Sequence, residues 1–597
     1  MKNKENVVSI IIIVTLSAIL AVGTGYYLYK NRNSTENTII TAQDLNLDIK
    51  TDYKDIDWSK YKTFDVELTE THNITEGGVY NLTGTISNGL ITIETSENVK
   101  LVLNNVSITN TNGPCIYVKE ADNVVIYLAE GSTNKLEDSA SYADEYTATD
   151  VDVDGAIYSK ADLIFDGTGT LNVTSNYKDA IVGKDDLVIS NGNYVISSKD
   201  DAIRGKDSVY IIDGKFEISA KGDGIKSTND TDDNKGFVCI EGGNFSITSE
   251  NDAIQATKDI LISNGDFTIS AVDDAIHSDA KLVINNGTIN ITKSEEGLEG
   301  SNVTINGGDI KVVSTDDGIN ASDGSGSTEM QGPGERQMAG NASQSSNNTA
   351  STNNSTDELS IVINGGNIYV NAAGDGIDSN GSVYVTGGNV LVDGPTNNGN
   401  GALDYNNEFK ITGGTVIAGG SSGMAQGASN SSTIYSVLIN FESSNAAGTV
   451  VSITDESGNQ VASYTGTKAF TSLVVATDKL KANTTYKIMV NGSEYKTFTT
   501  SNIVTTVGTS SGMQGSKQND RGFNMQKDSN NTSTEQMPTM PDGESFQGMP
   551  GGRPDSQDGS NQKQSSGNKQ MGRPNGQKTD RQNLDSKVMT RDVTDNI

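Results

Sequence analysis

The stretch VTINGGDIKVVSTDDGINA, residues 303–321, carries the clearest indication of the fold. Apolar and polar residues alternate on both sides of its Gly-Gly pair, a pattern typical of short β-strands joined by a tight turn. The second strand runs into an acidic turn, Asp316-Asp317-Gly318, and then into Ile319. A closely related stretch, IVINGGNIYVNAAGDGIDS, occupies residues 361–379. The same order of strand, glycine turn, strand and acidic turn therefore occurs twice in one frame.

These two stretches are copies of a unit of roughly 22 residues that recurs from about residue 155. Each copy places an apolar residue directly after its acidic turn, at Ile157, Ile181, Ile203, Ile225, Ile254, Ile276, Leu298, Ile319, Ile377 and Leu403. A fixed period of this length with alternating strands indicates a solenoid. We predict an all-β fold, a single-stranded right-handed parallel β-helix with about 22 residues per coil, plus a small C-terminal β module. The recurring apolar residue should point inward, and the glycines should occupy tight turns.

Breaks in this period predict the domain boundaries. We expect the β-helix over residues 61–420, with degenerate first coils before residue 150 and a disordered insert at 325–357. A different strand pattern predicts the small β module at 434–506, and the polar, low-complexity remainder predicts a disordered tail at 507–597. Residues 33–60 are expected to be a linker.

The N-terminal residues 1–32 predict a membrane anchor or a signal sequence. Lys2 and Lys4 precede a continuous apolar run over residues 7–29, long enough to cross a bilayer as a helix. The lysines favour a cytoplasmic N-terminus, which places the bulk of the chain outside the cell. A cleaved signal peptide, giving a secreted protein, is the alternative. Both interpretations predict an extracytoplasmic chain.

The charge of the chain excludes one class of partner. With 77 acidic and 43 basic residues the formal net charge is −34, so the surface should repel nucleic acid and attract cations. The two cysteines, Cys115 and Cys239, lie about five coils apart, or roughly 24 Å at the usual strand spacing. A disulfide requires Cα atoms within about 7 Å, so both are expected to be unpaired apolar fillers.

In register, the acidic turns should form a column of carboxylates about 5 Å apart, which repel one another. Calcium, a hard cation that takes six to eight oxygen ligands, is the natural counter-ion for such a column. Softer metals lack ligands, because His72 and His277 are the only histidines. The alternative is that the aspartates simply favour turns. The candidate metal ligands are Asp154, Asp179, Asp200, Asp201, Asp223, Asp252, Asp273, Asp274, Asp316, Asp317 and Asp375.

The repeat at residues 303–321 and 361–379 resembles the clostridial carbohydrate-binding proteins that are built as calcium-containing parallel β-helices. The resemblance covers roughly residues 60–420. It implies a pectate-lyase-like fold, binding of polygalacturonate and cellulose, and calcium at the acidic turns, including Asp274, Asp317 and Asp375. The copy Glu295-Glu296-Gly297-Leu298 departs from the motif, which puts a site there in doubt.

Two functions compete for this chain. The first is a non-catalytic, calcium-dependent, adhesin-like binder of an acidic plant polysaccharide or a cell-envelope glycan. Tyr158, Tyr194, Tyr210, Tyr369 and Tyr384 are expected to be exposed aromatic residues that stack on its sugars, the alternative being that tyrosine is simply common in strands. The second is a polysaccharide lyase with Arg204 as its base. Arg204 follows an acidic turn directly, and an arginine in that position is more often a neutralising partner of nearby carboxylates. Because acids recur in every coil and none is unique, the repeat favours binding.

Overall fold

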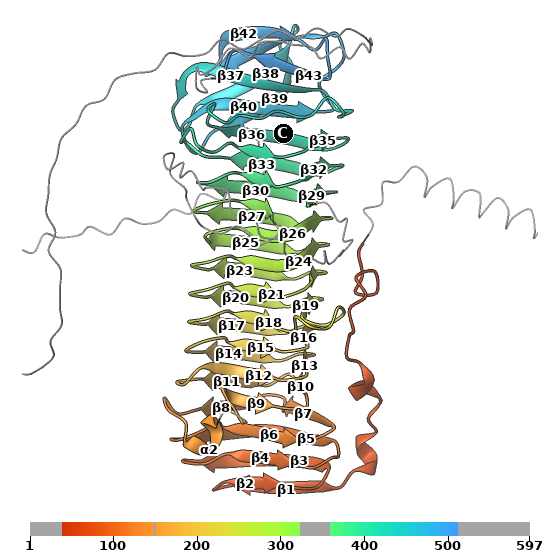
Figure 1. Ribbon diagram of the computed structural model, residues 1–597, viewed down its shortest axis with the longest axis vertical. Coiled ribbons are helices and arrows are strands. Elements are labelled where there is room, and N and C mark those ends of the chain that lie inside the picture. The colour runs from red at the N-terminus through yellow and green to blue at the C-terminus, as the bar shows by residue number, and fades with distance from the viewer. Residues whose placement is uncertain (1–38, 149–150, 323–358, 511–597) are drawn as a thin grey trace, which may run out of the picture. The chain divides into compact units, whose positions relative to one another are not determined.

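The computed structural model describes residues 39–148, 151–322 and 359–510, and it confirms the parallel β-helix. Three short strands make up one coil, and each strand pairs in parallel with its counterpart in the next coil (Figure 1). The predicted anchor (1–32), the predicted insert (325–357) and the tail from residue 511 lie outside the described residues. Among the described residues, no helix is both long enough and apolar enough to cross a membrane.

The strands form three columns that run along the stack of coils. The first column follows the acidic turns and contains β2 (His72–Ile74), β4 (Ile91–Glu94), β6 (Ile116–Glu120), β9 (Gly155–Ser159), β12 (Asp179–Gly183), β15 (Ile203–Gly205), β18 (Ile225–Ser227), β21 (Ile254–Ala256), the first part of β24 (Ile276–Ile284), the first part of β26 (Leu298–Ile305), β28 (Ile319–Ala321), β31 (Ile377–Ser379) and β34 (Leu403–Tyr405).

The second column contains β1 (Thr63–Leu68), the first parts of β3 (Gly78–Ile86) and β5 (Val99–Thr109), β7 (Asn123–Leu128), β10 (Asp162–Gly167), β13 (Asp186–Ile189), β16 (Ser208–Ile211), β19 (Phe237–Ile240), β22 (Ile260–Ile262), the later parts of β24 and β26, β29 (Ser360–Ile363), β32 (Ser382–Val385) and β35 (Phe409–Ile411). A glycine turn then leads to the third column.

The third column contains the later parts of β3 and β5, then β8 (Thr133–Glu137), β11 (Thr170–Thr174), β14 (Asn193–Ser197), β17 (Lys215–Ser219), β20 (Asn244–Thr248), β23 (Asp266–Ser270), β25 (Thr288–Lys293), β27 (Asp309–Ser314), β30 (Asn367–Ala372), β33 (Asn389–Asp393) and β36 (Thr415–Gly420). The helical segments are short and lie near the first coils: η1 (Asp52–Asp55), η2 (Trp58–Lys60) and α2 (Asp144–Thr147).

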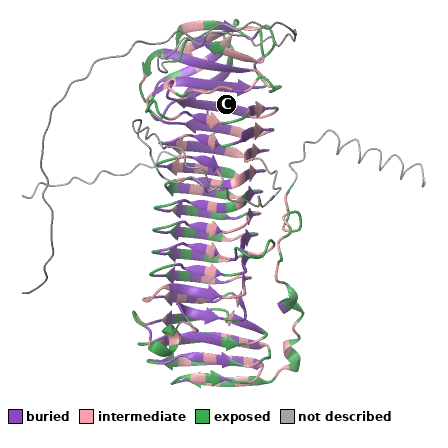
Figure 2. Ribbon diagram, viewed as in Figure 1, coloured by how far each residue is buried: buried purple, intermediate pink, exposed green. Residues whose placement is uncertain are grey.

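The residue after each acidic turn points inward, as predicted. Ile203, Ile225, Ile254 and Ile276 are direct register partners in successive coils, and none of the four side chains is exposed. Burying one such side chain contributes about 1.5–3 kcal/mol, so the column holds the coils in register. The alternation of buried and exposed residues along the strands follows the same pleat (Figure 2).

The predicted glycine turns share a positive φ. Positive φ angles occur at Gly192, Gly214, Gly243, Gly265, Gly287, Gly308, Gly366, Gly388 and Gly414. The stack therefore repeats its turn geometry as well as its strands.

The tyrosines considered as exposed sugar-binding residues are mostly buried, which corrects that expectation. Tyr194 lies inside the helix and stacks on Phe216, with ring centroids 5.0 Å apart. Tyr158 packs against Tyr117, with its ring buried. Tyr210 and Tyr369 point outward but are covered by other segments, and only Tyr384, the fifth, is partly exposed.

Residues 33–60 were expected to be a linker, but residues 39–60 pack along the β-helix. Ile40 exchanges hydrogen bonds with the Asn285 side chain, and Tyr53 Oη lies 3.0 Å from Ser190 Oγ. This segment covers an outward-facing apolar stripe made of Val125, Ile164, Val188, Tyr210, Cys239, Leu261 and Val283. Because the stripe crosses many coils, its apolar character is evident only when the coils are stacked.

The C-terminal β module continues the β-helix and also covers it. β37 (Ser436–Asn445), β40 (Phe470–Thr477) and β43 (Val504–Val507) belong to the long sheet, and β36 pairs with β40 in antiparallel. β38 (Val450–Asp455), β39 (Gln460–Thr465), β41 (Thr485–Val490) and β42 (Ser493–Thr499) form a separate four-stranded sheet. The module buries Tyr369, Leu391 and Ile417, outward residues of the last coils.

Both cysteines are unpaired and buried, which confirms that prediction. Cys115 lies in the interior of the helix, whereas Cys239 lies in the stripe under residues 39–60.

Candidate functional site

The acidic turns connect the third strand of one coil to the first strand of the next, and they hold two kinds of acid. Where a turn has two consecutive acids, the first is exposed, as at Asp200, Asp273 and Asp316. The second acid is held against the helix and is largely buried; these inner acids are Asp154, Asp179, Asp201, Asp223, Asp252, Asp274, Glu296, Asp317 and Asp375.

The inner acids link successive coils through the backbone. Asp201 Oδ1 accepts a hydrogen bond of 2.9 Å from the Asp223 N–H, and Asp223 Oδ1 accepts one of 3.0 Å from the Asp252 N–H. The same link joins the turns that follow Asp179, Asp252, Asp274, Asp317 and Asp375. In these seven aspartates one carboxylate oxygen thus has a structural role in the turn, and the second oxygen is left for other partners; Asp154 Oδ1 makes no such bond in the described residues.

The partner of that second oxygen is decided by the residue after each buried Ile or Leu. These residues form an outward column in register, made of Tyr158, Val182, Arg204, Lys226, Gln255, His277, Glu299, Asn320, Asp378 and Asp404. Cationic side chains occur only in the first part of this column, and acids only in the second. We call the coils with inner acids from Asp154 to Asp274 the cationic half, and those with inner acids from Glu296 to Asp375, together with the following coil that holds Asp404, the acidic half.

Arg204 neutralises three turns of the cationic half. Its Nη2 donates to Asp154 Oδ2 at 2.5 Å, its Nε donates to Asp179 Oδ2 at 2.7 Å, and Nε lies 3.6 Å from Asp201 Oδ2. Burial opposes the charge of this guanidinium, but the carboxylates of Asp179 and Asp154 raise its pKa above the ordinary value. Arg204 is therefore a counter-ion shared by successive coils.

Lys226 and His277 have the same role higher in the column. Lys226 Nζ pairs with Asp223. His277 Nδ1 lies 3.4 Å from Asp274 and 3.6 Å from Asp252, and Nε2 lies 3.3 Å from Asp279. Burial alone would lower the pKa of His277, but its hydrogen bonds to Asp274 and Asp279 and the neighbouring acids raise it to about 11. His277 thus carries a positive charge at neutral pH.

Beyond Glu299, which His277 contacts, the acidic half has no such counter-ion among the residues that the structure describes. Carboxylate oxygens of Asp317, Asp375 and Asp378 lie within 4.8 Å of one another, and no Lys, Arg or His of the described ranges forms an ion pair with them. We call these three residues the Asp378 cluster. Next to it, Asn320 Oδ1 is buried without a hydrogen-bond partner in the described part of the chain.

The electrostatics of the Asp378 cluster favour a bound cation. Burial, followed by the neighbouring carboxylates, raises the pKa of Asp317 to about 8 and that of Asp378 to about 7. Burial also raises the pKa of Asp375 to about 6. The cluster consequently retains protons near neutral pH unless a cation replaces them.

Other acidic groups are less suitable for a metal. Asp274, Glu296 and Glu299 bring ligand atoms together, but His277 lies against Asp274 and Glu299. In the Glu295-Glu296 turn, doubtful from the sequence, the Glu296 carboxylate also accepts no hydrogen bond from a backbone N–H of the next turn within the described residues, unlike the seven aspartates above. Of the eleven predicted ligands, the structure gathers Asp317 and Asp375 into a site without an internal cation, whereas Asp154, Asp179, Asp201, Asp223, Asp252 and Asp274 have internal cations nearby.

The sequence did not predict Asp378, which completes this cluster, because the candidate ligands were the acids that precede each Ile. A signal was available: the position after the Ile changes from Arg, Lys and His in early repeats to Glu and Asp in later ones. In a stacked fold, such a change places like charges beside a column that is already acidic.

Comparison with known proteins extends this description. A family model described as "carbohydrate-binding domain-containing protein" matches residues 69–324 and 262–399, which together cover more than half of the 597 residues. A protein of that same description from Acetivibrio thermocellus is 32% identical over 161 residues, 27% of this chain and 56% of that protein. The chain therefore spans little more than half the length of this relative. A solved polysaccharide lyase-like protein from C. thermocellum, a gadolinium derivative, is 31% identical with a TM-score of 0.36, covering 38% of this chain and 96% of the other.

Proposed function

The chain belongs to the family of carbohydrate-binding domain-containing proteins, and from that premise we propose that it is an extracytoplasmic, calcium-dependent, adhesin-like binder of polysaccharide. The observation that carries the calcium part is the Asp378 cluster, three mutually close carboxylates with no internal counter-ion in the described residues. Two such charges repel by about 3–4 kcal/mol at an effective dielectric constant of about 20. A divalent cation removes this repulsion.

The donor set of the Asp378 cluster fits calcium. Asp317, Asp375 and Asp378 supply hard carboxylate oxygens, and Asn320 adds an amide oxygen that lacks a partner. Calcium accepts six to eight oxygens in flexible geometry, so solvent or a ligand can complete its shell. An acidic polysaccharide has carboxylates suited to this position. Polygalacturonate is the probe that follows from this chemistry, and a glycan of the cell envelope is the other candidate ligand.

The alternative is a polysaccharide lyase with Arg204 as the base. The environment of Arg204 supports binding instead, because a base must first lose its proton and the surrounding carboxylates hold that proton more tightly. The guanidinium is also occupied by Asp154 and Asp179. A non-catalytic role is accordingly the proposal.

The proposed location rests on the sequence before residue 39. Lys2, Lys4 and the apolar residues 7–29 favour a single-pass anchor with the N-terminus inside and the bulk of the chain outside the cell, or secretion after signal cleavage. Extracellular fluid would supply the calcium. Protease accessibility of residues 40–510 on intact cells, compared with lysed cells, tests the outward orientation.

Calorimetric melting of the chain with calcium or with EDTA, together with polygalacturonate pull-downs, tests the function. We expect calcium to raise the melting temperature and to be needed for retention on the polymer. Asp317→Asn/Asp378→Asn should abolish both effects. Asp230→Asn/Asp233→Asn, which removes two exposed acids of a distant loop, is the matched control and should preserve them.

Two outcomes would overturn this proposal. Equal melting in calcium and EDTA would remove the calcium site. Release of unsaturated sugar from polygalacturonate, detected by absorbance and lost in Arg204→Ala, would establish the lyase.

A further inference from the structure

His277 stands where the cationic half meets the acidic half, and carboxylates from three coils face one atom of its ring. Nδ1 lies 3.4 Å from Asp274 Oδ2, 3.6 Å from Asp252 Oδ2 and 3.5 Å from Glu299 Oε2. Asp274 belongs to the turn of His277 itself, Asp252 to the preceding coil, and Glu299 is the register partner of His277 in the following coil. We call Asp252, Asp274, His277 and Glu299 the His277 site.

The distances in the His277 site fit the ligands of one metal ion better than they fit hydrogen bonds. A ring nitrogen carries at most one hydrogen, and an N–H···O bond is normally about 2.7–3.2 Å long. Around a tetrahedral zinc ion, whose bonds to nitrogen and oxygen are about 2.0–2.2 Å, neighbouring ligand atoms are about 3.3–3.6 Å apart. The three separations from Nδ1, 3.4, 3.6 and 3.5 Å, fall in that range.

Each of the three carboxylates has one oxygen held by the protein and presents the other oxygen to Nδ1. Asp252 Oδ1 accepts a hydrogen bond of 2.9 Å from the Asp274 N–H, and Asp274 Oδ1 accepts one of 2.9 Å from the Glu296 N–H. Glu299 Oε1 accepts a hydrogen bond of 2.8 Å from Ser322 Oγ. The orientation of the oxygen ligands is therefore set by the fold before any ion binds.

The other ring nitrogen has the partner that histidine ligands of metals usually have. His277 Nε2 lies 3.3 Å from Asp279 Oδ1. A metal-bound histidine typically donates its second N–H to a carboxylate, which fixes the ring and makes the first nitrogen a better ligand. Asp279 therefore has the place of an outer partner of the His277 site.

A buried acceptor without a partner stands beside the same ring. Gln255 is the register partner of His277 in the preceding coil, and its Oε1 is buried with no hydrogen-bond partner within the described residues. Such an atom in a native structure calls for an explanation, of which an unrecorded water or ion is the usual one. An ion in the His277 site, or a water bound to that ion, would satisfy it.

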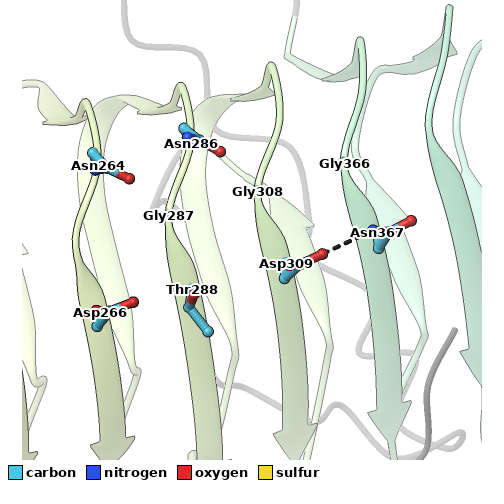
Figure 3. Close-up of a pocket in the computed structure, with 9 residues that line it drawn as sticks. All are labelled: Asn264, Asp266, Asn286, Gly287, Thr288, Gly308, Asp309, Gly366 and Asn367. Carbon is cyan, nitrogen blue, oxygen red and sulfur yellow. Dashed lines mark hydrogen bonds between the residues drawn. The ribbon is translucent and has the colours of Figure 1, made fainter.

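The acids at the glycine turns provide a contrast. A groove of about 390 Å³ is lined there by asparagine, aspartate, threonine and glycine residues (Figure 3). Its two acids, Asp266 and Asp309, are exposed, and Asp309 Oδ1 accepts a hydrogen bond of 2.8 Å from Asn367 Nδ2. In the His277 site the three carboxylates are instead only 10–12% exposed and converge on a nitrogen. That convergence distinguishes a built site from a row of surface acids.

The donor set of the His277 site selects the class of metal. Calcium takes oxygen ligands, so the imidazole that makes this group less suitable for calcium favours zinc, which binds nitrogen and carboxylate oxygen together. Histidine is scarce in the sequence, but one imidazole and three carboxylates supply the four donors of a tetrahedral site. The ring is 26% exposed, which leaves a path for the ion.

We propose that the His277 site binds a zinc ion, which joins three successive coils at the boundary of the two halves. The inference does not depend on carbohydrate binding, and the site shares no ligand with the Asp378 cluster. Without the metal, the protonated imidazole is the counter-ion described above. Zinc replaces the proton on Nδ1, which is released to solvent.

The test is calorimetric titration of the chain with zinc, after removal of metals with EDTA and dialysis, in an excess of calcium that fills sites made of oxygen alone. We expect one zinc ion per chain, and the strong visible absorption of tetrahedral cobalt when Co²⁺ is added instead. His277→Gln and, separately, Glu299→Gln should remove the cobalt spectrum and should weaken zinc binding by more than the about 10–100-fold that loss of an outer partner typically costs. Asp279→Asn should weaken it within that range.

The matched control is the other histidine of the chain. His72 lies in β2, in the first coils, and His72→Gln should bind zinc as the unmodified chain does. Melting curves in EDTA establish that each variant is folded. Loss of zinc binding in both ligand variants, with the control unchanged, would support the site.

Three results would overturn the inference: no zinc binding by the unmodified chain, zinc binding that is unchanged in His277→Gln, or the weak spectrum of octahedral cobalt. The outcomes also separate it from the proposed function. The Asp317→Asn/Asp378→Asn variant should lose its calcium response and keep its zinc binding. Zinc binding without retention on polygalacturonate would leave the His277 site standing and contradict the proposed function.

Discussion

The two halves of the acidic column differ in how the repulsion between their inner carboxylates is offset. In the cationic half, Arg204, Lys226 and His277 contact the inner acids of their own and neighbouring coils. In the acidic half, the same register position holds Asp378 and Asp404. Backbone hydrogen bonds to the inner carboxylates are common to both halves. Inner aspartates of both halves therefore have the same structural role in their turns, and the residue after the Ile determines whether a coil carries its own counter-ion or depends on an external one.

The largest expected effect on stability comes from removing the internal counter-ion Arg204. Arg204→Ala leaves Asp154 and Asp179 buried and unpaired, which typically costs about 3–5 kcal/mol. Hydrogen exchange of the amides in β12 and β15 should show that the free energy of local opening falls by this amount. Hydrogen exchange is the suitable measurement because a solenoid need not unfold in one step. Lys206→Ala, an exposed neighbour with no ion pair in the described residues, is the control. Unchanged exchange in Arg204→Ala would contradict the counter-ion role.

The next effect tests whether the two halves can be interconverted. Asp378→Arg places a cation where Arg204 stands in the cationic half, in reach of Asp317 and Asp375. We expect the variant without calcium to melt above the unmodified chain without calcium, and to lose its response to calcium. At 100 times the dissociation constant, that response should be about 2.7 kcal/mol in the unmodified chain. A variant that keeps its full calcium response would show that the ion binds elsewhere.

The pH dependence of the calcium response sharpens the same comparison. Folded-state pKa values of about 8 for Asp317, 7 for Asp378 and 6 for Asp375 exceed the unfolded values near 4. Without calcium, the stability of the acidic half should therefore be greatest at low pH and should fall as pH rises from about 4 through 8. Because calcium needs the ionised form, the calcium-induced rise in melting temperature should grow from pH 5 to pH 8. A response that shrinks over this range would contradict the assignment.

A smaller effect is expected at His277. Since its pKa is raised from 6.5 to about 11, its contribution is fully present below about pH 6.5 and is lost as pH rises through 11. His277→Gln should lower the stability of the neighbouring coils by about 1–3 kcal/mol at pH 6, as for a hydrogen bond to a charged group, and by less at pH 10. Melting curves at the two pH values measure the difference. An equal loss at both would indicate a packing role only.

The smallest effect should come from the outer acids. Asp200→Asn and Asp273→Asn change exposed side chains, so each should alter stability by less than about 0.5 kcal/mol. Asp201→Asn, at the adjacent inner position beside Arg204, should cost more in the same melting assay. Equal effects at Asp200 and Asp201 would erase the distinction between inner and outer acids.

Much of the β-helix was predictable, because its repeat is a local pattern read once per coil. Alternation set which residues face inward, the Ile after each acidic turn marked the register, and glycine marked the turn that needs positive φ. The candidate ligands Asp317 and Asp375 were found for the same reason. Asp378 was missed because its importance depends on which side chains stand in the coils before and after it.

The fold class, the period, the column of acids and the unpaired state of the cysteines can be predicted from the sequence alone, since each follows from local pattern or from separation along the stack. That Arg204, Lys226 and His277 neutralise part of that column is visible only in the folded chain. Only the folded chain also shows that residues 39–60 and the C-terminal β module cover outward apolar residues, including Tyr210 and Tyr369. The physical reason is distance along the chain: burial and Coulomb energy depend on neighbours in space, and stacking brings together groups that lie one or more coils apart in sequence.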